Sequence, residues 1–294
     1  FKGYIDEVRI YNRVLTDKEI RTDIGTSVAK SLVIEAGEVM LDHNWKRIDF
    51  KKKFSDPVVI STALSSNGGD AAVARVRNVD SSGFDISIQE WEYLDGNHAT
   101  ESLGYIAVER GSHVLPDGTR IEAGRVKTNA TASHERFGFN QGFDTEPVLF
   151  TTVSSSNDSA VVTTRLEGIG KTGFSVRMQE QESSKQVHDE ELISYIAWEP
   201  SSGSYDGIAF EIGRTGDVVN DDYYSIYFRS AYQETLAFLA HMQSTDGGNT
   251  ANVRWKNKDF HGVEVAVSEE QSADEETRHT KEDVGYAVFA PVTR

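Results

Sequence analysis

A threefold internal repeat limits what this 294-residue chain can fold into more than any other feature of its sequence. Equivalent arginines lie 90 and then 89 residues apart, at Arg75, Arg165 and Arg254. A glycine follows each arginine after eight positions, and a glutamate follows each glycine after seven more, at Gly83/Glu90, Gly173/Glu180 and Gly262/Glu269. Self-similarity at a fixed period indicates one structural unit built three times.

The match extends on both sides of these positions. Upstream, SDPVVISTALSS at 55–66 aligns with TEPVLFTTVSSS at 145–156, and EAGEV at 35–39 aligns with EAGRV at 122–126. The third copy is weaker there, because QETLAFLAHMQS at 233–244 lacks the proline. Downstream, a histidine lies eight residues after the glutamate in the first two copies and ten residues after it in the third. The third copy therefore carries a two-residue insertion.

Hydrophobic and polar residues alternate inside each copy with a period of two. Phe84, Ile86 and Ile88 share one side of the first copy, as expected for a strand with one buried face. Asn-Gly-Gly and Asp-Gly-Gly turns at 67–69 and 246–248 interrupt such runs. We therefore predict an all-β protein of three tandem antiparallel β-sandwich repeats, with roughly five to seven strands in each. The predicted repeats span 28–112, 113–203 and 204–294.

Residues 1–27 do not belong to the repeat. GYIDEVRIYNRVLTDKEI predicts a strand and then a short helix, which begins with a capping box between Thr16 and Glu19. This segment resembles the closing strand and helix of a laminin-G/concanavalin-like domain, which implies an extracellular chain with several domains. Residues 24–31 are expected to be a linker. The strand-like start without methionine indicates a piece of a longer chain, whose other domains are expected partners.

Composition excludes several classes of function. The chain has no cysteine, which rules out disulfides, thiolate nucleophiles and thiolate metal sites. Its formal net charge of −17 disfavours a nucleic-acid partner, because Lys and Arg dominate contacts to phosphate. Its apolar runs, such as AFLAH at 237–241, are too short to cross a bilayer, so we expect no membrane insertion.

Each copy resembles the H-type lectin domain over roughly 60 residues. In the first copy the resemblance rests on RVRNVDSSGFDISIQEWE at 75–92 and on the closing strand YIAVE at 105–109. It implies a six-stranded antiparallel sandwich that forms trimers and, in some members, binds N-acetylgalactosamine or galactose. Three tandem copies would then form a pseudo-trimer within one chain.

The sugar-contacting positions implied by this resemblance match only in part. Trp91 stands where the family has a sugar-contacting tryptophan, but Gln181 and Glu270 replace it in the other copies. The family's sugar-contacting arginine is missing, and its three positions hold Ala71, Val161 and Thr250. Galactose specificity therefore does not transfer. Side-chain alternation predicts that Trp91 points outward, whereas Trp45, Trp198 and Trp255 are expected in the core.

The pattern His-x2-Glu-x3-Tyr occurs once in each copy and uses three of the eight histidines: HATESLGY at 98–105, HDEELISY at 188–195 and HTKEDVGY at 279–286. We expect a hairpin loop to bring the histidine and the two glutamates of each copy to one rim of its sandwich. Three hypotheses stay open: ties that hold the loop, a sugar site with carboxylates and an aromatic face, or ligands for Ca²⁺ or Zn²⁺.

The candidate ligand-binding residues are Trp91, Glu90, Glu92, His98, Glu101, Tyr105, Arg75, Glu180, Glu182, His188, Glu191, Arg165, Glu269, His279, Glu282 and Arg254. We expect no catalysis, because an enzyme usually concentrates one constellation in one pocket rather than repeating it three times. The leading hypothesis is a non-catalytic, lectin-like carbohydrate-binding module of a secreted polysaccharide-active enzyme or surface adhesin, with a polysaccharide or glycan as partner. The alternative is a structural or adhesive spacer repeat of a large surface protein, with calcium as an optional stabiliser. Both hypotheses place the chain outside the cell.

Overall fold

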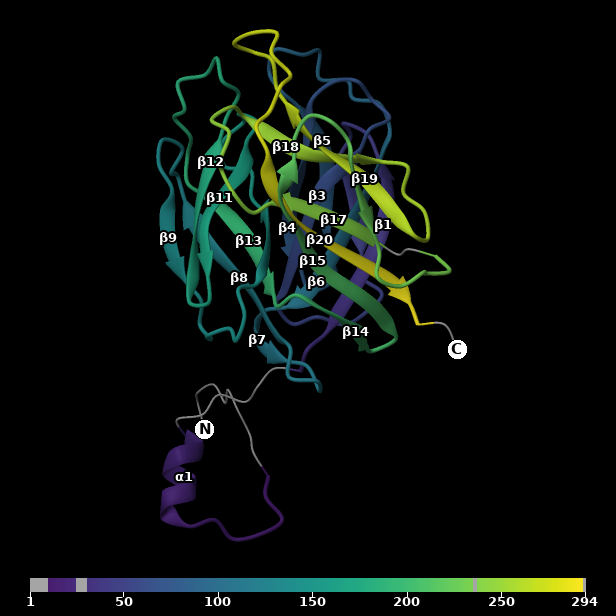
Figure 1. Cartoon of the computed structure of the whole chain (residues 1–294). Coiled ribbons are helices and arrows are strands. Elements are labelled where there is room, and N and C mark those ends of the chain that lie inside the picture. The colour runs from purple at the N-terminus through teal and green to yellow at the C-terminus, as the bar shows by residue number, and fades with distance from the viewer. Residues whose placement is uncertain (1–9, 25–30, 235–236, 293–294) are drawn as a thin grey trace.

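The computed structural model describes residues 10–24, 31–234 and 237–292, and it consists of one helix and 20 strands (Figure 1). The helix α1 (Asp17–Ile24) lies apart from the body that the strands form. The predicted capping box is confirmed: the Thr16 amide donates to the Glu19 carboxylate at 2.8 Å, and the Glu19 amide donates to Thr16 Oγ1 at 3.3 Å. The strand predicted within residues 1–9, and most of the linker, lie outside the described residues.

The first copy folds into two three-stranded antiparallel sheets. Its strands are β1 (Ile34–Leu41), β2 (Lys46–Asp49), β3 (Pro57–Ser65), β4 (Ala72–Asp80), β5 (Gly83–Glu90) and β6 (Glu101–Glu109). One sheet has the order β1-β6-β3 and the other has the order β2-β5-β4. The two sheets pack face to face, so the predicted antiparallel sandwich is confirmed.

The second and third copies repeat this topology with an additional short strand at the start of each. The second copy contains β7 (Gly111–Val114), β8 (Arg120–Thr128), β9 (Glu135–Gly138), β10 (Val148–Val153), β11 (Thr163–Gly170), β12 (Gly173–Gln179) and β13 (Glu191–Trp198). The third contains β14 (Ser201–Tyr205), β15 (Ile208–Val219), β16 (Tyr224–Tyr227), β17 (Ala237–Met242), β18 (Ala251–Lys256), β19 (Gly262–Glu269) and β20 (Glu282–Pro291). The sheets β8-β13-β10 and β15-β20-β17 correspond to β1-β6-β3, and the sheets β9-β12-β11 and β16-β19-β18 correspond to β2-β5-β4.

The alternating residues predicted to share one side fill the interior of each sandwich. Phe84, Ile86 and Ile88 of β5 pack against Leu103 and Tyr105 of β6, and all of them are buried. Phe174 and Val176 occupy the same place in the second copy. Burial of one face per sheet accounts for the period of two, because successive side chains of a strand point to opposite faces.

The other face of each first sheet is buried in a core that the three copies share. Ile60, Phe150 and Leu239 occupy equivalent positions in β3, β10 and β17, and all three belong to this axial core. Trp198 lies there as well, with 1% of its surface exposed. Strands β3, β6, β10 and β13 are therefore covered on both faces, which explains their nearly continuous apolar sequences.

The three copies close into a ring. Residues Arg254 and Trp255 of β18 pair in parallel with Leu64 and Ser65 of β3, so the third copy joins the first in a six-stranded sheet. The third copy thus lies beside the first, and the arrangement is a pseudo-trimer. Among the described residues, no helix has the length and apolar character that crossing a membrane requires.

Candidate functional site

The glutamate that begins the last strand of each copy is the centre of the His-x2-Glu-x3-Tyr motif. Glu101 is fully buried at the start of β6. Its carboxylate accepts hydrogen bonds from the Ser65 hydroxyl and from the amides of Asn67 at 2.9 Å and Gly68 at 2.7 Å. The Asn-Gly-Gly turn predicted at 67–69 therefore has a local function, because it presents two backbone donors to one buried carboxylate.

An arginine from a neighbouring copy forms an ion pair with each of these carboxylates. The Arg254 guanidinium of the third copy donates to Glu101 of the first copy at 2.6 Å. In the same way Arg75 pairs with Glu191 at 2.6 Å, and Arg165 pairs with Glu282 at 2.7 Å. Arg75–Glu191 joins the first copy to the second, and Arg165–Glu282 joins the second to the third. Arg254–Glu101 joins the third copy to the first. We name these boundaries between copies junction 1–2, junction 2–3 and junction 3–1.

The arginines also hold the turn of the copy that they reach. Arg254 donates to the carbonyl oxygens of Ser65 and Asp70, at 2.8 and 3.0 Å. Arg75 donates to the Ser155 carbonyl oxygen at 2.8 Å, and Arg165 donates to that of Asn249 at 2.8 Å. Each arginine therefore contacts the motif of a neighbouring copy and not that of its own copy. On β4, β11 and β18 the arginine points away from its own sandwich, so it meets the next copy.

The histidine connects the two glutamates of its own copy. In the first copy, His98 Nδ1 lies 2.9 Å from Glu90 Oε1 and His98 Nε2 lies 3.3 Å from Glu101 Oε1. In the second copy, His188 Nδ1 lies 3.0 Å from Glu180 and Nε2 lies 3.5 Å from Glu191. His279 contacts Glu269 and Glu282 in the third copy. The histidine and glutamates thus converge at one rim of each sandwich, and we call each group with its incoming arginine a rim cluster.

Burial and pairing shift the proton affinities of the rim clusters in opposite directions. Burial raises the pKa of Glu191 and Glu282, but hydrogen bonds from the histidine and the charge of the arginine outweigh it, so the pKa of each falls to about 2. Burial lowers the pKa of His98 and His188, but hydrogen bonds to two carboxylates raise it overall. Charge pairs of this kind lock the geometry of their surroundings, because breaking one leaves an uncompensated buried charge.

The tyrosine of the motif belongs to a second network. The hydroxyl of Tyr195 donates to Glu122 at 2.8 Å, and that of Tyr286 donates to Glu211 at 2.9 Å. Tyr105 makes a longer contact of 3.4 Å with Glu35. Burial and the neighbouring carboxylate raise the pKa of Tyr105 to about 12. These glutamates were not candidates from the sequence, although the repeated EAG at 35–37 and 122–124 marks two of them.

The expectation that Trp91 points outward to solvent is wrong. Only 1% of its surface is exposed, and it packs with Ala71, Val73 and Val161. Val161 belongs to the second copy, so a neighbouring copy covers the face that alternation directs away from the first sandwich. Trp198 and Trp255 are buried as predicted, whereas Trp45 is only half-buried and carries the Arg77 guanidinium 3.8 Å above its ring.

Most other candidate residues are inaccessible to a large ligand. The buried ones are Arg75, Glu90, His98, Glu101, Tyr105, Arg165, Glu180, His188, Glu191, Arg254, Glu269, His279 and Glu282. Glu92 is exposed, and Glu182 is half-buried and accepts the Thr250 amide at 3.0 Å. The described part of the chain contains no group of three or more His, Asp or Glu side chains placed to hold a metal ion.

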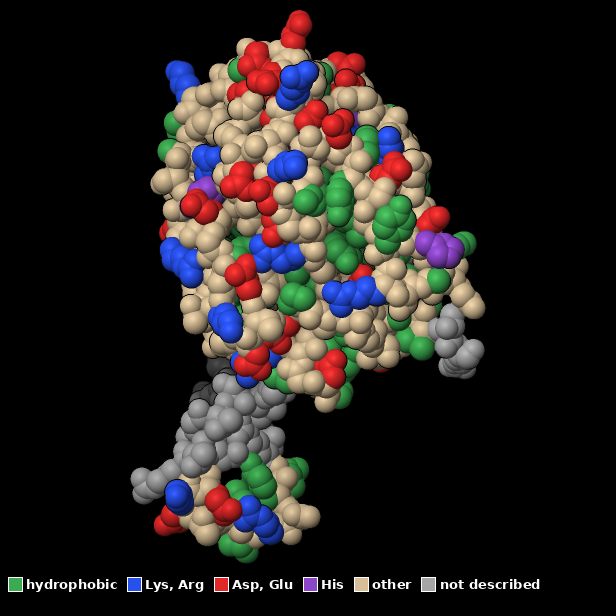
Figure 2. Space-filling view, viewed as in Figure 1, with side chains coloured by type: hydrophobic (Ala, Val, Ile, Leu, Met, Phe, Trp, Pro, Cys, Tyr) green, Lys and Arg blue, Asp and Glu red, His purple; other side chains and the backbone are tan. Residues whose placement is uncertain are grey.

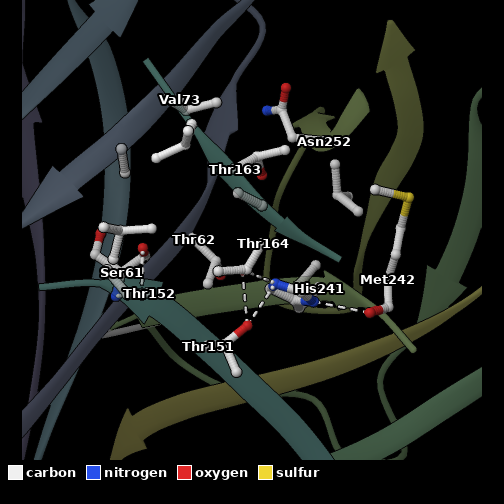
Figure 3. Close-up of a pocket in the computed structure, with 16 residues that line it drawn as sticks. Ser61, Thr62, Val73, Thr151, Thr152, Thr163, Thr164, His241, Met242 and Asn252 are labelled. Atoms are coloured by element: carbon white, nitrogen blue, oxygen red, sulfur yellow. Dashed lines mark hydrogen bonds between the residues drawn. The ribbon is translucent and has the colours of Figure 1, made fainter. Parts of the chain in front are cut away.

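A small polar cavity lies inside the body, where β3, β10 and β17 come together (Figure 3). Its volume is about 40 Å³, and Thr62, Thr152 and His241 line it from equivalent positions of the three copies. His241 Nε2 lies 3.0 Å from the hydroxyls of Thr151 and Thr164, and Nδ1 lies 2.8 Å from the Met242 carbonyl oxygen. Burial lowers the pKa of His241 to about 4, so the imidazole is neutral at pH 7.

Fold and site together define an all-β protein in which three sandwich repeats close into a pseudo-trimer through buried charge pairs. No family model and no solved structure matches the chain. It is 29% identical over 262 residues to Halomucin of Haloquadratum walsbyi, an alignment that covers 85% of this chain and 3% of Halomucin. The chain is thus similar to one small segment of a very long protein.

Proposed function

We propose that this chain is a structural or adhesive repeat block of a large extracellular or cell-surface protein. The observation that carries the proposal is the ring of three buried Arg–Glu pairs, each of which fastens one copy to the next. The similarity to a short stretch of Halomucin supports it, because that stretch is only 3% of the length of Halomucin, as expected for one block of a very long protein.

The saturation of the Glu101 carboxylate favours this function over ligand binding at the motif of the first copy. Glu101 accepts donors from a hydroxyl, two amides, a histidine and an arginine, all supplied by the protein. A fully hydrogen-bonded and buried carboxylate offers no free acceptor to a sugar or a cation. The repeated His, Glu and Arg side chains then serve to hold turns and copies together.

Single-molecule force spectroscopy tests the block directly. If the ring makes the three copies one mechanical unit, pulling on the two ends should release the stretch from Ile34 to Pro291 in one event, with a length gain on the order of 900 Å. Three separate events, each on the order of 300 Å, would show that the copies are independent modules and would refute the proposal.

Carbohydrate binding is a second candidate function, in keeping with the resemblance to H-type lectins. It is favoured by a hollow of about 320 Å³ beside Trp45, lined also by Asp42, Asn44 and Lys46. A partly exposed indole ring with polar groups around it is the chemistry that holds sugars. Figure 2 shows acidic and basic side chains interspersed over the visible face, a surface suited to a neutral polymer as well as to solvent.

A glycan array distinguishes the two candidates. Under the carbohydrate hypothesis a defined set of glycans retains the protein, and Trp45→Ala abolishes retention while Trp91→Phe, at the buried tryptophan, does not. Absence of retention by any glycan, with the protein folded, leaves the structural block as the function. Neither proposal includes a catalytic step, and the Glu101 carboxylate offers no free acceptor to calcium, because protein donors occupy both of its oxygens.

A further inference from the structure

The groove at junction 3–1 has a volume of about 430 Å³. The third copy contributes Asp221, Tyr223 and Glu269 to its lining, and the first copy contributes Asp70 and Tyr93. Two hydrogen bonds span the groove between the copies: the Tyr223 hydroxyl donates to Ser66 Oγ at 2.7 Å, and the Gln271 amide donates to the Tyr93 hydroxyl oxygen at 3.0 Å. This volume lies within the range of small-molecule sites in proteins.

Glu269 differs from its two equivalents in one respect. Glu90 Oε2 accepts the Gly96 amide at 3.0 Å, and Glu180 Oε2 accepts the Ser184 hydroxyl. Glu269 Oε2 has no hydrogen-bond partner, and the residue is buried, with 6% of its surface exposed. The two-residue insertion between Glu269 and His279 explains the difference, because it lengthens the loop that supplies this partner in the other copies.

An unpartnered buried carboxylate oxygen is costly and rare in folded proteins, so a partner from outside the chain is expected. The groove is also rich in negative charge, because Asp70 and Asp221 line it together with Glu269. The one guanidinium in the lining belongs to Arg254, and it is already committed to Glu101 and to three carbonyl oxygens. His279 contacts the other oxygen, Glu269 Oε1, so the lining of the groove supplies no cation to Glu269 Oε2.

We propose that this groove binds a small organic ammonium ion, a molecule that carries a primary amine. An ammonium group supplies three donors and a compact positive charge, which match the carboxylates of Glu269 and Asp221. Tyr93, a residue that is 39% exposed, gives the organic part aromatic surface to contact, whereas one face of the Tyr223 ring already carries the Lys256 ammonium at 3.6 Å. A neutral polyol would leave the charge of the groove unbalanced.

Isothermal titration of the whole chain with putrescine and with 1,4-butanediol tests the proposal, because the two probes share a four-carbon chain and differ in charge. Putrescine should bind at one site per chain, and butanediol should not bind measurably. The affinity for putrescine should fall as sodium chloride rises, because salt screens the attraction. Equal binding of both probes, or several equivalent putrescine sites per chain, would overturn the proposal.

Matched variants locate the site. Glu269→Gln should weaken putrescine binding at least about tenfold, because it removes the carboxylate charge and the Oε2 acceptor that has no partner in the protein. Glu180→Gln makes the same change where Ser184 already supplies the partner, and it should leave binding unchanged. Asp70→Asn, which changes an exposed side chain and leaves the backbone carbonyl that Arg254 contacts, should weaken binding by up to about fivefold. Equal losses in Glu180→Gln and Glu269→Gln, or no loss in Asp70→Asn, would contradict the assignment.

Discussion

Each rim cluster joins four side chains that cannot be buried singly. The carboxylates of Glu90 and Glu101 face His98, and Arg254 supplies the remaining charge. A buried ion is tolerated only when partners replace its lost hydration. The cluster is therefore a device for specificity: it fixes one turn, one loop and one neighbouring copy in a single arrangement.

Breaking one of the charge pairs should destabilise the fold more than removing both partners. Arg75→Met leaves the Glu191 carboxylate buried without its cation and should lower the free energy of unfolding by about 3–5 kcal/mol. The double variant Arg75→Met/Glu191→Gln should lose less than the sum of the single changes. Urea denaturation measures both, and Lys127→Met, which breaks the exposed pair with Glu190, should cost less than about 1 kcal/mol. Strict additivity would contradict the coupling.

His241, the neutral histidine of the small polar cavity, predicts that the fold loses stability in acid. The pKa of His241 falls from an ordinary 6.5 to about 4 on folding, so the unfolded state binds a proton more readily. The stability that the neutral imidazole contributes is fully present above pH 6.5 and is lost as the pH falls to 4. The free energy of unfolding should fall by about 3 kcal/mol over this range. Glu191 and Glu282, whose pKa falls from 4.5 to about 2, add a further loss only below pH 4.5.

Denaturation at a series of pH values checks this, with His241→Gln as the variant that cannot titrate. The variant should lose the slope between pH 6.5 and 4.5 and keep the loss at lower pH. Identical slopes in the two proteins would show that another group is responsible.

The strands that carry the tyrosines depend on glycines in the neighbouring strand. A Cβ atom added at Gly124 of β8 would lie 2.4 Å from the Tyr195 ring of β13, and Gly37 and Gly213 stand in the same relation to Tyr105 and Tyr286. The ring lies across the glycine and reaches the glutamate two residues earlier. The E-x-G pattern in β1, β8 and β15 is thus a steric requirement of the sheet.

Gly124→Ala should therefore destabilise the protein by about 1–3 kcal/mol, because the ring must leave its position and lose its bond to Glu122. Gly142→Ala is the matched control, since a Cβ there meets nothing within 4 Å. Thermal melting of the two variants provides the comparison. A melting temperature for Gly124→Ala no lower than that of the control would show that the sheet accommodates the methyl group.

At the scale of the whole molecule, the axial core and the ring make the copies interdependent. Ile60, Phe150 and Leu239 meet in one core, and no copy can bury its share alone. Each copy also receives an arginine from one neighbour and gives one to the other. Loss of any copy would expose both a core face and a charged junction.

Calorimetry should consequently show one unfolding transition, with equal calorimetric and van't Hoff enthalpies. A chain that lacks residues 204–294 should lose this cooperative transition, because Arg165 then has no Glu282 and β3 has no β18. Three resolved transitions in the full chain, or an unchanged melting temperature in the shortened one, would contradict the closed ring.

The sequence by itself determined the three copies, the sandwich class and the convergence of His98, Glu90 and Glu101. These follow from the repeat and from the alternation of side chains, which are local properties of a strand and its hairpin. Tertiary structure alone decided that Trp91 is buried, that Arg75 pairs with the second copy and that Glu269 Oε2 lacks a hydrogen-bond partner. The physical reason is that alternation tells which face of a sheet a side chain occupies, whereas only the packing of whole copies decides what covers that face.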